Sequence, residues 1–141
     1  MHKPFLYEPL EYETERASNG YLMSLLSAFL GTPLPIVNLI AIVIFFIGNR
    51  KGSYFIRWHC TQVLLSQLSL FIINSFGFWW TIHVILGWSD INNRYIGYIL
   101  TVFIINVTEL VMNIYAAIKV RQGIHIEWWL YGPFTSVLCK P

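Results

Sequence analysis

The chain has 141 residues, of which 56% are hydrophobic, 17% are aromatic and 11% are charged. A soluble domain carries about 25% charged residues, so this composition excludes an ordinary soluble domain and predicts an integral membrane protein. The formal net charge of +2 is too small to indicate a nucleic-acid partner, and none is expected.

A polar segment and an interrupted hydrophobic stretch open the chain. Residues 1–20 are polar, and residues 22–48 exceed the ~20 apolar residues that cross a bilayer once. Pro33 and Pro35 interrupt this stretch, because each removes a backbone donor and pushes the preceding residue out of the helical region. We expect two short helices, roughly 14–31 and 35–49, joined by a tight turn. A single span kinked at Pro33 and Pro35 is the alternative.

Two longer segments follow. Residues 53–88 can form a helix that overruns a hydrocarbon core of about 30 Å, and after a turn at 87–93 a last span runs from about Tyr95 to Ala117. The fold expected is all-α, an integral membrane helical bundle with four transmembrane segments, or three if the first is kinked. Its regions are a polar N-terminal segment (1–20), a single transmembrane domain (21–121) and an aromatic, interfacial C-terminal tail (122–141).

The basic residues predict the orientation. Most of those near the spans would share one side of the membrane: Arg50, Lys51, Arg57, Lys119 and Arg121. The turn between the two long segments carries Arg94 alone. By the positive-inside rule, the basic loop 49–57 and the C-terminus are expected to be cytoplasmic. The membrane would be a bacterial inner membrane or, alternatively, an organellar inner membrane.

Polar side chains inside the spans fall on two helix faces. Members recur at helical spacing, with His59, Gln62 and Ser66 on the third segment and Asn106, Glu109 and Asn113 on the last. A carboxylate facing lipid would be costly, so these faces should look into a bundle or toward a partner chain, with Gln67 and Glu109 at similar depth. Interhelical hydrogen bonding, worth ~1 kcal/mol per contact, is favoured over a proton or ion relay built on Glu109 and His59.

These observations define the candidate residues. The predicted contact or partner face comprises Arg57, His59, Gln62, Ser66, Gln67, Asn106, Glu109 and Asn113. The predicted anchors at the membrane interface are Trp58, Trp88, Trp128 and Trp129. The chain has no HExxH or CxxC motif, no glycine-rich phosphate loop and no Ser, His and Asp set of plausible geometry. We therefore expect no enzyme, no catalytic residue, no metal site and no cofactor, and two unpaired cysteines.

Segment 57–65, with the sequence RWHCTQVLL, resembles the start of a membrane helix in a family of small four-helix membrane proteins. That family is related to the channel-forming subunit of the chloroplast inner-envelope protein import machinery and includes uncharacterised bacterial relatives. The basic linker 49–56 and the closing segment 116–123 are also similar to it, and the resemblance covers roughly 21–133. Cys60 and Val63 stand where the family has small residues, and its aromatic-proline pair appears late, at 131–133.

The resemblance implies a non-enzymatic membrane subunit of a multi-protein complex linked to protein translocation or transport. Its partners would be membrane lipids and other membrane protein subunits. The alternative is a small homo-oligomeric channel or carrier with Glu109 and His59 lining the path.

Overall fold

The structure, a computed structural model, describes residues 5–30 and 35–141. Within this part the chain is all-α, as predicted, with five helices and no strand. In chain order they are α1 (Glu11–Leu30), α2 (Pro35–Asn49), α3 (Tyr54–Ile85), α4 (Asn93–Arg121) and α5 (Tyr131–Leu138). Of these described helices, α3 and α4 are long and apolar enough to cross a membrane, and α2 is a shorter apolar helix.

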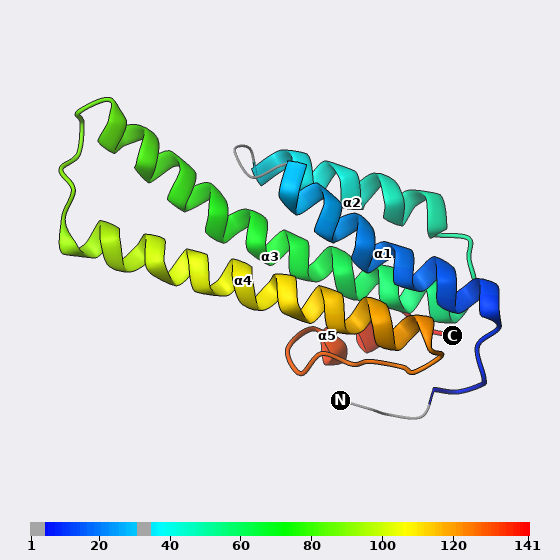
Figure 1. Cartoon of the computed structure of the whole chain (residues 1–141). Coiled ribbons are helices and arrows are strands. Elements are labelled where there is room, and N and C mark those ends of the chain that lie inside the picture. The colour runs from blue at the N-terminus through cyan, green and yellow to red at the C-terminus, as the bar shows by residue number, and fades with distance from the viewer. Residues whose placement is uncertain (1–4, 31–34) are drawn as a thin grey trace.

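The interrupted hydrophobic stretch forms two helices that lie side by side (Figure 1), so the single kinked span is wrong. α1 starts inside the predicted polar segment, because the Glu13 carboxylate accepts a 2.8 Å hydrogen bond from the Leu10 N–H at the helix start. Pro35 opens α2, a position where its missing N–H has no helical partner to lose. The expected tight turn, with Pro33, lies outside the described residues.

Left-handed glycines end the two long helices. After α3, Gly87 has a φ of 72°, and the Trp88 N–H bonds the His83 carbonyl at 2.9 Å. Gly123 ends α4 in the same way, with a φ of 79°. The Asn92 side chain starts α4 by accepting a 2.9 Å bond from an N–H of its first turn. These local signals turn the chain back and set α3 and α4 antiparallel.

The four longer helices form a bundle of unequal ends. α3 has 32 residues and α2 has 15, or about 48 and 22 Å, so the α3–α4 hairpin projects well past α1 and α2 (Figure 1). At one end of the bundle, α1 and α3 begin and α4 finishes, and we call this the packed end. We call the opposite end the hairpin end. The buried core lies toward the packed end and comprises Ala17, Tyr21, Ile42, Phe55, Val63, Ala116, Ala117, Val120, Ile126 and Trp128.

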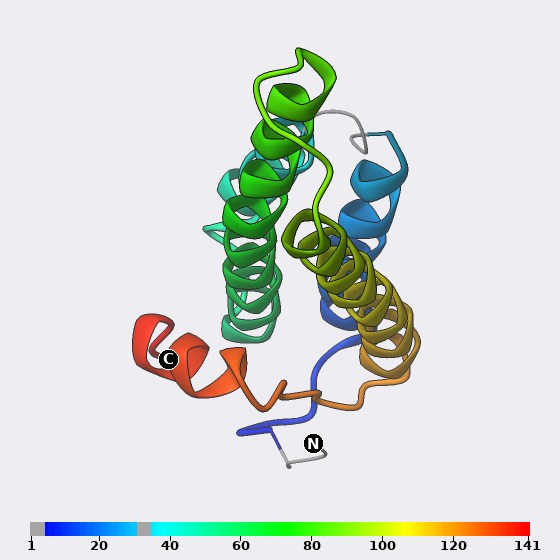
Figure 2. The ribbon, with the colours of Figure 1, turned by 90° about the vertical axis from the view of Figure 1, so that its left-hand side faces the viewer.

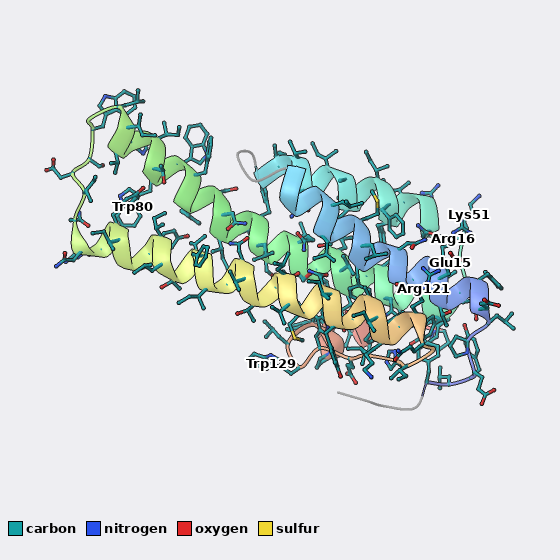
Figure 3. All side chains as sticks on the ribbon, viewed as in Figure 1. Glu15, Arg16, Lys51, Trp80, Arg121 and Trp129 are labelled. Carbon is teal, nitrogen blue, oxygen red and sulfur yellow. The ribbon has the colours of Figure 1, made fainter. Side chains whose placement is uncertain are left out.

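The C-terminal tail folds back onto the packed end. It forms α5, which lies across the axis of the bundle beside α3 (Figures 1 and 2). Glu15, Arg16, Lys51 and Arg121 gather at the packed end, whereas Trp80 lies near the hairpin end (Figure 3). The Arg121 guanidinium and the Glu15 carboxylate form an exposed 3.3 Å ion pair between α4 and α1.

Candidate functional site: two buried polar networks

The first network joins α1, α3 and the tail. We call it the tail network, and its members are Tyr21, His59, Gln62, His125, Ile126 and Trp128. The Tyr21 hydroxyl lies 2.8 Å from His59 Nδ1, and His125 Nδ1 lies 3.2 Å from His59 Nε2. Gln62 Nε2 donates to the Tyr21 hydroxyl at 2.9 Å, and Gln62 Oε1 accepts from the Trp128 N–H at 3.0 Å. His59 and Gln62 are 0% exposed, so these bonds take the place of water.

Backbone groups set the direction of proton donation in this network. The Trp128 N–H needs the oxygen of Gln62, which turns Gln62 Nε2 toward Tyr21 and, at 3.3 Å, the Ile126 carbonyl. The Tyr21 oxygen accepts from Gln62, and its own proton has His59 Nδ1 as acceptor when that nitrogen is unprotonated. In this tautomer a neutral His59 carries its proton on Nε2 and donates it to His125 Nδ1. The tail is thus held through one continuous chain of donors.

Aromatic rings enclose the two imidazoles. Ring centroids lie 4.4 Å apart for Trp58 and His125, 4.6 Å for Phe55 and His59, and 4.8 Å for Phe5 and His125. Apolar rings on both sides keep water away from the donor chain, which strengthens each bond. The polar start of α3 therefore binds the protein's own tail.

This packing corrects the placement of two predicted interface anchors. Trp58 is 2% exposed because the tail covers it, and Trp128 is 3% exposed because its ring packs against Tyr21 and Tyr131. Neither ring can reach lipid headgroups. Trp88 and Trp129 are 71% and 77% exposed, and their role as anchors stays a prediction.

The second network ties α1, α2, α3 and α4 together. We call it the four-helix network, and its members are Ser24, Asn38, Ser66, Gln67, Glu109 and Asn113. Glu109 Oε1 accepts hydrogen bonds from Ser66 at 2.7 Å, from Gln67 at 3.0 Å and from Asn113 at 3.1 Å. Gln67 Nε2 also donates to Ser24 at 2.6 Å, and Gln67 Oε1 accepts from Asn38. The expected depth match of Gln67 and Glu109 is confirmed, and the carboxyl group is compensated inside the bundle.

The residues of each predicted polar face bond different partners. Asn106 does not join the network of Glu109 and Asn113. It exchanges two hydrogen bonds with Asn74 nearer the hairpin end, at 3.1 and 2.7 Å. On α3, His59 and Gln62 serve the tail network while Ser66 serves the four-helix network. Arg57 reaches the Lys140 carbonyl at 3.4 Å. All eight predicted residues therefore have a bond within the chain, and a role toward partner chains stays a prediction.

Sequence reasoning missed four of the side chains that form hydrogen bonds in these networks. Tyr21 and Ser24 form a polar pair on α1 at i, i+3 spacing, and Asn38 is polar within an apolar helix, so each carried a detectable signal. His125 lies in an irregular segment and carried none. Each of the four supplies a bond between elements that are distant in the sequence.

Among residues 5–30 and 35–141, no group of three or more His, Cys, Asp or Glu side chains could hold a metal ion. Cys60 and Cys139 are free and buried. Burial raises the pKa of the Cys139 thiol, an effect that nearby Arg57 opposes.

Comparison with known proteins identifies the family. No curated protein and no solved structure gives a significant match. The model of the MamF/MmsF family, described as the magnetosome magnetite crystal formation protein family, matches residues 16–137. This finding overturns the resemblance to the chloroplast import family. The expected translocation-complex subunit is wrong, and its channel alternative is not retained.

The error has a physical source in segment 57–65. The polar and aromatic side chains of this segment bond the protein's own tail, a contact that carries no signature of the import family. The family and the two long apolar helices together indicate a membrane protein. With most of its length matched, the chain belongs to the magnetosome magnetite crystal formation protein family.

Proposed function

We propose that this chain is an integral protein of the magnetosome membrane that takes part in the formation of the magnetite crystal. The family match carries the proposal, since residues 16–137 include α2, α3 and α4 whole and most of α1 and α5. The length and apolar character of α3 and α4 support the membrane location. The role is non-enzymatic, in keeping with polar side chains that are hydrogen-bonded between helices and to the tail.

The proposed topology has four membrane segments. On α2, Ile36, Ile40, Ile44 and Ile47 recur along one face and are between 49% and 64% exposed. An exposed aliphatic stripe on a helix whose other face packs on the bundle is suited to lipid. This supports placing α1 and α2 in the bilayer beside α3 and α4.

The charge distribution supports one orientation. The cations of the packed end, Arg16, Lys51 and Arg121 among them (Figure 3), favour a cytoplasmic location for that end under the positive-inside rule. The α3–α4 turn then faces the magnetosome lumen. Its exposed Asp90 and Asn93 present carboxylate and amide oxygens on the side where the crystal grows. Membrane lipids and other magnetosome membrane proteins are the partners that this topology offers, and further copies of the chain are a third.

Gene deletion in a magnetosome-forming bacterium that carries this chain tests the function. We expect crystals of altered size or shape in electron micrographs, restored by the wild-type chain and by Glu8→Gln, a change to an exposed carboxyl at the packed end. Asp90→Asn should restore them incompletely. Unaltered crystals in the deletion strain, or absence of the chain from isolated magnetosome membranes, would contradict the proposal.

A further inference from the structure

The bundle is wider at the packed end than at the hairpin end. The bonds of Gln67 with Ser24 and Asn38 place these three residues at one level. From that level α1 continues to Leu30, about 9 Å, whereas α3 continues to Ile85, about 27 Å. By this count the α3–α4 hairpin extends about 18 Å past the end of α1. Figure 1 shows the hairpin projecting beyond α1 and α2. Among the described helices, four fill the packed end and two fill the hairpin end.

Helix α5 adds to the wide end. It lies across the bundle (Figure 2), with its buried Gly132 and Thr135 on the protein side. Trp58 Nε1 donates to Ser136 at 3.4 Å, which fixes α5 at the level of the second turn of α3. A helix that lies across a membrane-spanning bundle runs along the membrane surface.

The outer face of α5 is apolar. Phe134, Val137 and Leu138 are 61%, 71% and 65% exposed, and Trp129, just before the helix, is 77% exposed. An apolar face of this kind on so short a helix points to an apolar environment.

The depth of α5 and its neighbouring charges identify that environment. The exposed isoleucine stripe of α2 ends at Ile47, nine residues past Asn38 toward the packed end, and Trp58 lies nine residues before Gln67, so Ile47 and Trp58 share a level. Because that stripe faces lipid in the topology proposed above, the hydrocarbon core of ~30 Å ends close to this level. The level of Trp58 then falls in the headgroup layer. Arg57 bonds the Lys140 carbonyl at 3.4 Å, which places two cations at the C-terminal end of α5. Apolar side chains beside cations at headgroup depth match an anionic phospholipid surface.

We propose that the protein acts as a wedge that favours bilayers convex on the packed side, with α5 lying in the plane of the cytoplasmic surface. Four helices and α5 spread the cytoplasmic leaflet, while the α3–α4 hairpin occupies less area in the other leaflet. The phosphates of anionic lipids bind Arg57 and Lys140, and their acyl chains receive Phe134, Val137 and Leu138. The cytoplasmic face of a small vesicle has this curvature. The inference rests on the membrane topology proposed above.

Orientation in reconstituted vesicles tests the wedge. The full chain, with a C-terminal epitope, is inserted into phosphatidylcholine–phosphatidylglycerol vesicles that are either small and sonicated or large and extruded, and epitope accessibility reports the share with the packed end outside. We expect a clear excess outside in small vesicles and near-equal shares in large ones. Val137→Ser with Leu138→Ser should remove much of the excess. The matched control, Leu6→Ser with Leu10→Ser, changes exposed side chains outside α5 and should keep it.

Spin labels separate this inference from the membrane proposal. Labels are placed at Val137→Cys and, on the exposed face of α4, at Ile104→Cys, in chains whose native cysteines are replaced by alanine. We expect both labels to be reached by oxygen and protected from a water-soluble nickel chelate. A water-exposed label at 104 would overturn the membrane topology itself. A lipid-embedded label at 104 with a nickel-accessible label at 137 would overturn the placement of α5 alone.

Two further outcomes would also overturn the wedge. Equal orientation shares in small and large vesicles, with both labels in lipid, would remove the preference for curvature. Spin–spin broadening at 137, with protection from both oxygen and nickel, would assign the face of α5 to a second copy of the chain in place of lipid.

Discussion

Gln62→Leu is expected to destabilise the folded protein by about 3 kcal/mol. The side chain is 0% exposed and holds Tyr21, the Ile126 carbonyl and the Trp128 N–H at 2.9, 3.3 and 3.0 Å. Leucine fills a similar volume but leaves the two backbone groups of the tail buried without a partner. Each such group costs about 1–3 kcal/mol, so two predict a loss of about 2–6. We expect a loss of stability toward the lower end of this range, because the tail can move so that water bonds the two backbone groups.

Unfolding by SDS in mixed micelles, followed by circular dichroism, measures this loss. Gln122→Leu is the matched control, because Gln122 is exposed at the end of α4 and its replacement should change stability by less than about 0.5 kcal/mol. Limited proteolysis gives a second readout, since a released tail should be cleaved faster in the Gln62 variant. Wild-type stability together with wild-type protection of the tail would refute the tail network as a source of stability.

Three more outcomes follow from the buried contacts. Glu109→Leu should cost about 1–3 kcal/mol more than Glu109→Gln in the same unfolding assay, because glutamine keeps an oxygen acceptor for the surrounding donors; equal losses would contradict this. A double-mutant cycle of Asn74→Ala and Asn106→Ala should give a coupling of about 0.6–1.7 kcal/mol, since the two amides exchange two bonds, and zero coupling would show that the pair adds nothing. In a Cys60→Ala chain, alkylation of Cys139 at neutral pH should be slower than that of a free thiol, because burial raises the pKa of this thiol and keeps it protonated. The alkylation rate should increase as the pH rises. If folded and unfolded chains were alkylated at the same rate at every pH, burial of this thiol would be contradicted.

Helical spacing alone was enough to predict the long helices and one of their contacts. In an antiparallel hairpin, residues pair by their distance from the turn, so Gln67 and Glu109 could be matched by counting. Pro33 and Pro35 likewise predicted a break between two helices, and α1 and α2 have it between them. These features depend on local sequence, which is why they could be read without the fold.

The tail network could not be predicted in this way. Trp128 reaches Gln62, and His125 reaches His59, across 66 residues of chain, and the segment that carries them has no periodicity. An aromatic ring in a polar tail can face lipid or protein, and its neighbours in the sequence do not distinguish the two. The polar start of α3 was accordingly taken as a mark of another family, although the residues that give it this character bind the tail.

The tail closes the packed end, so formation of the α3–α4 hairpin and completion of the bundle are separate folding steps. The α3–α4 hairpin uses residues that are near each other in the sequence and can form while the ribosome is still attached. The packed end brings together the first and last parts of the chain, as the 4.8 Å approach of the Phe5 and His125 rings shows. Its closure must therefore wait until residues 125–128 have left the ribosome. A chain truncated before residue 124 would keep its membrane segments and could still insert. Its Gln62 and His59 side chains would lack their tail partners at the packed end of the bundle.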